Sequence, residues 1–277
     1  MDIGDFSWKE MMAIFFARDL EDGERVCCGA NTEITFAATM LAQKMHAPNL
    51  KLQLGATCYL CNVADYEIPE LPRTSVDYRI VRWAEAYFHH PETALYFGPP
   101  GHRRYITEHE RFKDTNKYFM GDKFFVGGLQ VDMHGNVNLI GIGKGGKFKV
   151  RGPGSVGISD LVTVRQIYVF MTDHHPSRLV EKVDYISAPG WAAWRKYNHV
   201  GGGIKYIVTP KAVFERDPEK DTACLAGTFP GVTMEDVESN TGFPVTLSSH
   251  FKPVPPPSRQ ELSRLRNEVD RTGVLRR

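Results

Sequence analysis

Two rhythms of apolar and polar positions succeed each other along the first 55 residues of the chain. Ser7 and Glu10 have the spacing of a helix capping box, apolar residues then recur at helical intervals, and Gly23 fits the end of that helix. Shorter apolar runs, typical of buried strands, lie between the helical stretches. The predicted elements are a helix at 8–20, a strand at 24–28, a helix at 33–45 and a strand at 51–54. This alternation with short loops predicts an α/β fold: an open, mostly parallel sheet with flanking helices.

The rest of the chain carries further patterns of both kinds. The predicted elements are helices at 79–90 and 107–117 and strands at 123–126, 166–171 and 204–208. The glycine run at 201–203 indicates either a mobile loop or a point where two backbone segments come close. We expect residues 1–277 to form a single domain, in which 253–277 comprise a Pro-rich extended linker and a final helix capped by Ser258.

Charge and composition exclude several classes of protein. Lys and Arg total 34 against 33 for Asp and Glu, so no excess of charge indicates a nucleic acid or a membrane as partner. No apolar run reaches about 18 residues, the length typical of a transmembrane helix. The acidic start of the chain lacks a signal-peptide pattern, and five cysteines fit a reducing compartment. We therefore expect a soluble, cytoplasmic protein.

Glycine is concentrated between residues 126 and 160. Ten of the chain's 25 glycines fall there, which predicts tight turns with exposed backbone N–H groups suited to a phosphate or an oxyanion. Two patterns of dinucleotide-binding type, at 141–146 and 152–157, are discounted because a strand-like alternation follows the first and Pro153 interrupts the second. A P-loop is discounted because Phe148 stands where Ser or Thr must hold magnesium.

The carboxyl ends of the predicted parallel strands are the expected place of an active site. Ligands of open parallel sheets bind beyond these ends, which places residues 29–33 and 55–58 near any such site. Glu33 lies there at the start of a predicted helix. Two interpretations of this carboxylate stay open: it lines the pocket, or it complements the positive end of the helix dipole.

Metal or redox chemistry has weak support. The Cys58–Cys61 pair lacks the second pair that a zinc site of this kind needs. The adjacent histidines at 89–90 and 174–175 point apart on any regular element, and each pair precedes a proline. Asp132 and Asn136 flank a hairpin-like turn and are most simply turn formers. We therefore expect no metal site.

Three motifs, in this order along the chain, resemble those of one enzyme family. The first motif, 127–138, reads Gly-Gly-Leu-Gln-Val-Asp and then Gly-Asn-Val-Asn; the second, 183–191, reads Val-Asp-Tyr-Ile-Ser-Ala-Pro-Gly-Trp; the third, 238–243, reads Glu-Ser-Asn-Thr-Gly-Phe. They resemble the motifs G-G-x-Q-x-D…G-N-x-N, V-D-Y-x-T-S-P-G-W/H and E-N-T-G-F of the β subunit of two-subunit family I CoA-transferases. Glutaconate CoA-transferase is the nearest type, and the resemblance covers nearly the whole chain.

The resemblance implies a family I CoA-transferase-like α/β subunit that pairs with a homologous α subunit, as αβ or α2β2, and acts on an acyl-CoA. In these transferases a glutamate in an E-x-G motif attacks the thioester. It forms an acyl anhydride and then a glutamyl-CoA thioester, which splits one hard exchange into easier steps. Coenzyme A would be part of the substrate, and no permanently bound cofactor is implied.

The chain departs from the family at the catalytic strand. The glutamate position corresponds to Gln53, Leu54 or Gly55, none of which carries a carboxylate. This departure resembles a branch of two-subunit CoA hydrolases that open a ring of steroid-derived acyl-CoA by cleaving a carbon–carbon bond. In that branch the β subunit lacks the nucleophile, and an acidic residue of the α subunit serves as base. The resemblance favours hydrolytic cleavage of a β-dicarbonyl acyl-CoA in catabolism over CoA transfer.

Candidate site residues follow from the motifs and from the strand ends. Glu33 is the candidate catalytic carboxylate. The candidates for oxyanion or acyl-CoA contacts are Gly127, Gly128, Gln130, Gly29, Asn31 and Gly55. Besides CoA transfer, other interpretations stay open: a non-catalytic scaffold subunit that supports a catalytic α subunit, a free-standing binding protein, and a sugar-phosphate isomerase-like enzyme on a related fold.

Overall fold

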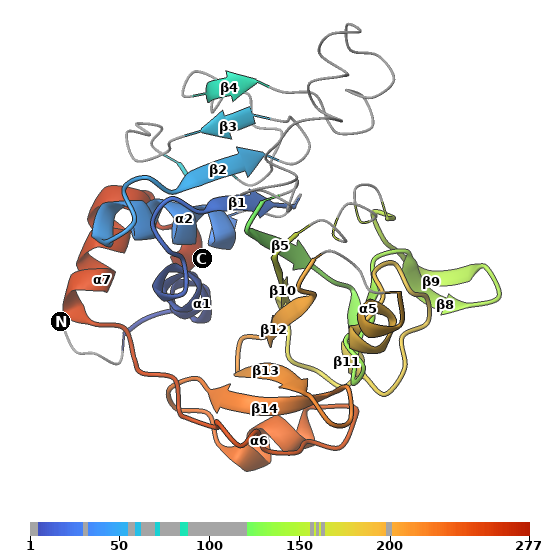
Figure 1. The fold of residues 1–277 in the computed structure, drawn as a ribbon. Coiled ribbons are helices and arrows are strands. Elements are labelled where there is room, and N and C mark those ends of the chain that lie inside the picture. Colours follow the sequence, from blue (N-terminus) through green and yellow to red (C-terminus); the bar gives the residue numbers. More distant parts are fainter. Residues whose placement is uncertain are drawn as a thin grey trace, which may run out of the picture.

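The structure of the protein is a computed structural model (Figure 1). It describes residues 5–29, 33–54, 59–61, 70–72, 84–87, 121–155, 158, 161, 164–197 and 201–277. Within these residues the largest element is a nine-stranded sheet, whose strand order is β14-β13-β12-β10-β5-β1-β2-β3-β4.

Five parallel strands form the middle of this sheet. They are β12 (Ile204–Val208), β10 (Gln166–Phe170), β5 (Lys123–Gly127), β1 (Arg25–Cys28) and β2 (Lys51–Leu54). Antiparallel strands extend both edges: β13 (Ala212–Asp217) and β14 (Thr222–Thr228) on one side, β3 (Tyr59–Cys61) and β4 (Ala84–Tyr87) on the other. The predicted open sheet with a parallel centre is confirmed.

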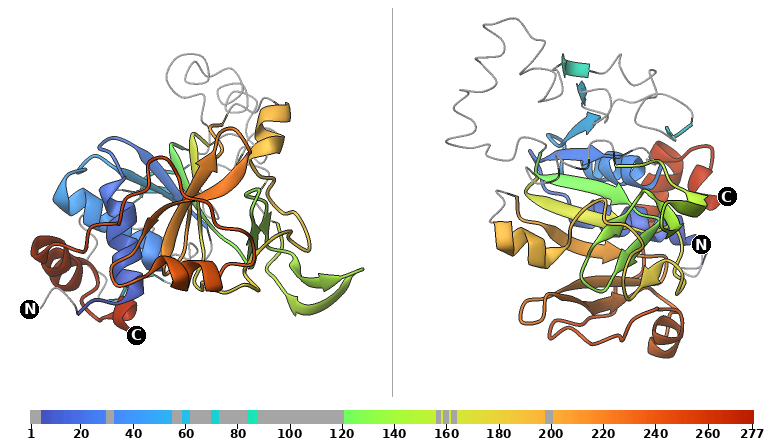
Figure 2. Two further views of the ribbon diagram at one scale, coloured as in Figure 1. Left: turned by 90° about the horizontal axis from the view of Figure 1, so that it is seen from below. Right: turned by 90° about the vertical axis from the view of Figure 1, so that its right-hand side faces the viewer.

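Two hydrophobic cores lie on opposite faces of the sheet. Phe125 of β5 belongs to the first core, whereas its neighbours Phe124 and Val126 belong to the second, and Cys28 and Cys27 of β1 are divided in the same way. Successive side chains of a strand point to opposite faces, so one apolar run supplies both cores. The first core is covered by α1 (Trp8–Arg18), α2 (Glu33–Met45) and α7 (Arg259–Arg264), and the second by α5 (Trp191–Tyr197) and α6 (Met234–Ser239) (Figures 1 and 2).

Local signals correctly predicted both ends of the chain. The side-chain oxygens of Ser7 and Ser258 accept hydrogen bonds from the backbone three residues on, at 3.1 and 3.2 Å, and both capping boxes form. After α7 the chain continues through a π-helical turn (Leu265–Val269) and a 3-10 turn (Val274–Arg276). The first helix, however, ends at Arg18, so Gly23, with φ of 76°, lies in the next turn and not at the helix end.

One predicted helix is wrong in the part that the structure describes. Residues 84–87, within the predicted helix 79–90, form β4 and pair with β3. A short apolar run has no strong preference for helix or strand, and here pairing at the sheet edge decides. The predicted helix at 107–117 lies outside the described residues. At 201–203 the backbone-approach interpretation is confirmed, because a Cβ on Gly202 would lie 2.1 Å from Arg165 O.

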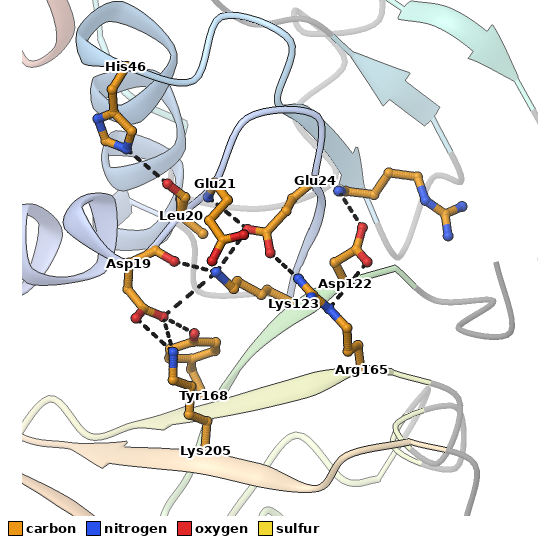
Figure 3. A network of polar contacts seen from close by, with 11 residues as sticks. Asp19, Leu20, Glu21, Glu24, His46, Asp122, Lys123, Arg165, Tyr168 and Lys205 are labelled. Carbon is orange, nitrogen blue, oxygen red and sulfur yellow. Dashed lines mark hydrogen bonds and ion pairs between the residues drawn. The ribbon is translucent and has the colours of Figure 1, made fainter. Parts of the chain in front are cut away.

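Buried ion pairs join the amino ends of the parallel strands (Figure 3). Lys123, the first residue of β5, is 1 % exposed, and its Nζ lies 2.8 Å from Glu24 Oε2. Lys205 Nζ lies 2.7 Å from Asp19 Oδ1, and Asp19 also accepts hydrogen bonds from Lys123 and from Tyr168. Burial and the nearby Asp19 raise the pKa of Tyr168. The charges at this edge are satisfied among themselves, which leaves the carboxyl edge for a ligand.

Candidate active site

Glycines stand where two neighbouring parallel strands reach the carboxyl edge of the sheet. Gly29 follows β1, and its N–H donates to Phe125 O of β5 at 3.2 Å. Gly127 ends β5 opposite Phe170 of β10. A Cβ added at either glycine would meet these neighbours at 3.4 Å or more, an ordinary contact distance. Both glycines thus lie at the carboxyl edge, where the strand pattern places them.

Gly128, which follows β5, has less space around it than Gly29 or Gly127. A Cβ there would lie 3.1 Å from Val137 Cγ1 and 3.2 Å from Met171 Sδ, so an alanine would have to displace its neighbours. The N–H group of Gly128 forms no hydrogen bond within the part of the chain that the structure describes. Half-buried backbone donors usually find a partner. A rigidly held N–H of this kind can donate to a ligand oxygen or stabilise an oxyanion.

Gln130 fixes the turn that follows Gly128. Its side chain is buried in β6 (Gln130–Asp132), which pairs with β7 (Val137–Asn138) and β11 (Leu179–Val180). Gln130 Oε1 accepts hydrogen bonds from Asn138 Nδ2 at 2.7 Å and from Asp184 N at 3.2 Å. The carboxamide oxygen therefore joins the first motif to the second. A direct contact between Gln130 and an acyl group stays a prediction.

The turn between β6 and β7 is built around a buried carboxylate. Asp132 Oδ1 accepts hydrogen bonds from the backbone N–H groups of His134 and Asn136, both at 3.0 Å, and Asp132 Oδ2 accepts one from Val183 N at 3.3 Å. Asn136 Oδ1 accepts from Gly190 N at 2.8 Å. The prediction that Asp132 and Asn136 form a turn is confirmed, and the same two side chains also hold the second motif against the first.

The third motif closes this arrangement. Gly242 N donates to Leu179 O of β11 at 2.7 Å, and a Cβ on Gly242 would lie 2.4 Å from that oxygen. The preceding Thr241 contacts His174, whose Nε2 lies 3.1 Å from Thr241 Oγ1 and whose Nδ1 lies 2.7 Å from Thr209 Oγ1. All three motifs thus meet beyond the carboxyl ends of β5 and β10.

The hydrogen bonds of His174 define one neutral tautomer. Thr241 Oγ1 donates to Val237 O at 2.8 Å, so it accepts from His174 Nε2–H, which leaves Nδ1 of the neutral ring as an acceptor. Thr209 Oγ1 already accepts from Lys211 N and Ala212 N, and its one proton is shared between Nδ1 at 2.7 Å and Ala212 O at 3.1 Å. Burial, and secondly the charge of Lys211, lower the pKa of His174 from 6.5 to about 4. The imidazole is therefore a neutral brace between the loop after β10 and the loop after α6.

The glycine run at 141–151 forms a hairpin. Strands β8 (Gly141–Lys144) and β9 (Lys147–Arg151) are joined by Gly145 and Gly146, with φ of 59° and 77°. The strand-like alternation after Gly146, for which the pattern at 141–146 was discounted, is confirmed as β9; residues 156 and 157 of the second pattern lie outside the described residues. Gly143 N donates to Asp184 Oδ2 at 2.8 Å and Gly146 N to Tyr185 Oη at 3.1 Å. These two amides donate within the fold, so they are not among the exposed N–H groups that the glycine pattern predicts for a phosphate or an oxyanion.

Neither Asp184 nor Tyr185 is among the sequence-predicted site residues. The available signal was their place in the second motif, where an acid and a tyrosine stand side by side. Their partners, Gly143 and Gly146, are about 40 positions away in the chain, and such pairing has no local signature.

Glu33 is the first residue of α2, close to the carboxyl end of β1. Its carboxylate is 20 % exposed, and Oε1 lies 3.9 Å from Lys9 Nζ of α1. The described contact of Glu33 is therefore with a neighbouring helix, and its place in the first helical turn suits the helix dipole. The catalytic role stays a prediction. Asn31 and Gly55 lie outside the described residues.

Metal clusters and membrane-spanning helices are absent from the residues that the structure describes. These residues contain no group of three or more His, Cys, Asp or Glu side chains that could hold a metal ion. No helix among them is long and apolar enough to cross a membrane. Cys58 and the histidines at 89–90 lie outside the described residues, and His174, the buried member of the other pair, contacts hydroxyl groups.

Comparison with known proteins gives consistent matches over almost the whole chain. Residues 9–240 match the sequence profile of a family described as Coenzyme A transferase. The B-type subunit of glutaconate CoA-transferase from Acidaminococcus fermentans is 26% identical over 279 residues, covering 97% of this chain and 94% of that relative. The crystal structure of that enzyme matches with a TM-score of 0.78 at 24% identity, covering 99% of this chain and 98% of the other.

Two further solved structures share the fold at lower identity. The decarboxylase AibA/AibB matches with a TM-score of 0.74 at 21% identity. IpdAB of Rhodococcus jostii RHA1 matches with a TM-score of 0.67 at 17% identity. In both comparisons the match covers 98% of each chain.

Proposed function

Because the chain belongs to the coenzyme A transferase family, we propose that it is the B-type subunit of a two-subunit enzyme acting on an acyl-CoA thioester. The proposed reaction is hydrolytic, ring-opening cleavage of a carbon–carbon bond in a β-dicarbonyl acyl-CoA. The observation that carries this choice is the absence of a carboxylate from residues 51–55. Strand β2 runs parallel to β1 with Leu54 opposite Cys28, so it ends at the same edge as Gly29.

The two reactions differ in what this strand end must supply. CoA transfer through glutamyl-CoA needs a carboxylate that attacks the thioester and then carries CoA. An amide, an alkyl group or a hydrogen at this position cannot form that intermediate. Hydrolytic cleavage needs none: water attacks the ring ketone, the bond from that carbon to the α-carbon of the thioester breaks, and its electron pair forms a thioester enolate that is then protonated. The product is a carboxylic acid that keeps its CoA thioester.

The described residues include a group that can stabilise the negative charge that develops on oxygen in this reaction. Both the tetrahedral intermediate and the enolate carry negative charge on oxygen. Such charge is stabilised by backbone donors that are already in position. Gly128 N–H is the candidate donor, because crowding by Val137 and Met171 fixes its place and no described group uses it. The base that activates water comes from the A-type partner in this proposal.

A trapping experiment tests the choice. The chain is co-purified with its A-type partner, incubated with an acyl-CoA and treated with borohydride or hydroxylamine, and the peptides of this chain are analysed by mass spectrometry. The hydrolase proposal predicts no reduced or hydroxamate-modified residue. The matched control is Gly55→Glu, which restores a carboxylate at the strand end and gives the label a place to form. A label on the unmodified chain would refute the proposal.

Product analysis separates the remaining reactions. Hydrolytic cleavage keeps the thioester and consumes one water, CoA transfer moves CoA from the acyl-CoA to a second carboxylic acid, and decarboxylation releases carbon dioxide. Genuine CoA transfer is the second candidate, because the relative with 26% identity is a CoA-transferase subunit. Incubation in ¹⁸O-labelled water distinguishes it: label in the new carboxylate supports hydrolysis, and its absence with exchange of CoA supports transfer.

Glu33 and the scaffold interpretation are tested by substitution. Glu33→Gln keeps the size of the side chain and removes its charge. If kcat falls at least tenfold while assembly is unchanged, the carboxylate acts in catalysis; if only stability changes, it serves the helix N-terminus. In the scaffold interpretation, changes at Gly128 weaken assembly or substrate affinity and leave kcat as it was.

A further inference from the structure

We propose that the hairpin at 141–151, together with Tyr185 and Ile186, is the surface on which the A-type partner subunit docks. We call this hairpin the arm. The proposal rests on the two-subunit part of the proposed function and adds the place and chemistry of the contact. The partner is expected to present apolar side chains beside carboxylates.

The arm projects from the body of the molecule and has no core of its own (Figures 1 and 2). Every residue of β9 is exposed. An isolated two-stranded hairpin is at best marginally stable in water, so such an element normally packs against something. Within the described residues four large hydrophobic side chains are exposed, and three of them lie here: Phe148 at 38 %, Val150 at 43 % and Ile186 at 56 %. Clustered exposed apolar groups mark an interaction site.

The arm is nevertheless held in one conformation. The hydrogen bonds that two of its backbone N–H groups donate to Asp184 and Tyr185 fix the arm to the second motif. The ring centroids of Phe148 and Tyr185 lie 5.4 Å apart. A Cβ on Gly141 would lie 2.5 Å from Phe148 Cδ1, so the glycine makes room for the ring. A surface held in place before binding loses less conformational entropy when a partner arrives. The two hydrogen bonds, the contact between the two rings and the space left by Gly141 thus hold in place an apolar surface that no described residue covers.

The charge of the arm selects among possible occupants. Its charged side chains are Lys144, Lys147, Lys149 and Arg151, with no acid, although the whole chain has a net charge of only +1. None of these four cations forms an ion pair within the described residues. A two-fold contact between two copies would set one arm against the other and bring like charges together. A free phosphate would pair with the lysine charges but leave the apolar groups in water. A protein surface with carboxylates and apolar side chains both pairs with the lysines and buries the apolar groups.

The arm offers a partner two kinds of side chain, apolar and basic. Phe148 and Val150 are the apolar residues of β9, and Lys147 and Lys149 are its lysines; the pairing with β8 is irregular between Phe148 and Val150. The ring of Phe148 contacts that of Tyr185 at an interplanar angle of 47°, and Ile186 follows Tyr185 in the chain. Buried apolar contacts contribute most to affinity, whereas rim charges mainly steer association. The apolar and the basic side chains of the arm can therefore be tested separately.

The test measures binding of the full-length chain to the A-type subunit of the same organism. Val150→Ser/Ile186→Ser is the apolar variant, and Leu247→Ser, equally exposed at 57 % but away from the arm, is its control. Lys147→Glu/Lys149→Glu is the charge variant, and Lys252→Glu/Arg259→Glu, which are also exposed, form its control. Dissociation constants and association rates come from surface-based kinetics at two salt concentrations, and complex size from light scattering.

The apolar variant is expected to raise Kd about tenfold or more, mainly through faster dissociation. The charge variant is expected to slow association about tenfold and to lose most of its salt dependence. Both controls should bind as the unmodified chain does. Unaltered binding of the two arm variants overturns the proposal, as does an arm-dependent dimer of this chain alone or an effect confined to KM for acyl-CoA.

These results separate the arm from the proposed function. An unmodified pair that assembles through the arm but does not turn over acyl-CoA refutes the function and keeps the docking surface. An unmodified chain that does not bind the A-type subunit refutes the two-subunit assembly itself, and with it this inference.

Discussion

Acidification should weaken the fold through His174. In the folded protein this imidazole is 5 % exposed, braced by two threonine hydroxyls and stacked on Phe214 with ring centroids 6.2 Å apart. Protonation would put a charge into this buried site and turn Nδ1–H towards Thr209 Oγ1, which already accepts from two backbone N–H groups. The unfolded chain carries no such penalty. A proton therefore binds the unfolded state more tightly than the folded one.

The size and direction of the effect follow from the pKa. Burial lowers the pKa of His174 from 6.5 to about 4, a difference of about 2.5 units, and each unit corresponds to about 1.4 kcal/mol. A lowered histidine pKa leaves stability intact above about pH 6.5 and removes it as the pH falls towards about 4. The full loss is about 3 kcal/mol, of which about 2 kcal/mol should be gone by about pH 5.

Urea denaturation between about pH 7.5 and pH 5 measures this loss. The unmodified chain is compared with His174→Gln, which cannot titrate, and with His175→Gln, its exposed neighbour, as control. The unmodified chain and the control should lose about 2 kcal/mol more than His174→Gln over this interval. The glutamine variant starts lower at neutral pH, but only the slope is compared.

Two results would refute the reasoning. If His174→Gln loses stability with the same slope as the unmodified chain, other groups cause the pH dependence. If an NMR titration finds an ordinary pKa for the His174 ring, the imidazole is not braced between the two threonines.

Three further predictions concern stability and turnover. Gly128→Ala should lower kcat about tenfold to a hundredfold by displacing the N–H donor, whereas Gly127→Ala, where a Cβ meets only ordinary contacts, should lower it less, as measured by steady-state kinetics. Asp132→Ala should lower the free energy of unfolding by about 3–5 kcal/mol in urea, because several buried donors lose their acceptor. Lys123→Met should cost about 3 kcal/mol in the same assay by leaving Glu24 short of one partner, and adding Glu24→Gln should recover part of that loss.

Controls separate these effects from general damage. Gly128→Ala must keep a cooperative unfolding transition, because loss of folding alone would also abolish turnover. For Asp132, the matched position is the half-buried Asp217 at the end of β13, whose Oδ1 accepts from Glu219 N in the exposed turn that follows: Asp217→Ala should change stability far less. If Lys123→Met is as stable as the unmodified chain, the amino-edge ion pairs contribute no net stability and the reasoning on that edge is wrong.

The amino-acid sequence by itself determined the elements whose signals are local. Capping boxes, helical spacing and apolar runs predicted α1, α2, β1, β2, β5, β10 and β12, since each depends on residues within a few positions of one another. Asp132 and Asn136 were predictable as turn formers for the same reason. The motifs at 127–138, 183–191 and 238–243 indicated the family, but their spacing along the chain said nothing of why those residues are needed.

Tertiary structure decided the rest, because the deciding partners are far apart in the chain. Residues 84–87 form a strand since a neighbouring strand offers unpaired backbone groups, which no helical spacing reveals. Gln130 and Asp132 each accept, besides their local hydrogen bonds, one from backbone more than 50 positions away, and local sequence did not reveal these long-range partners. The glycines at 141–146 form a hairpin arm because Asp184 and Tyr185 take up two of their amides. Long-range hydrogen bonds thus position these motif residues, because each bond satisfies a group that would otherwise be unpaired.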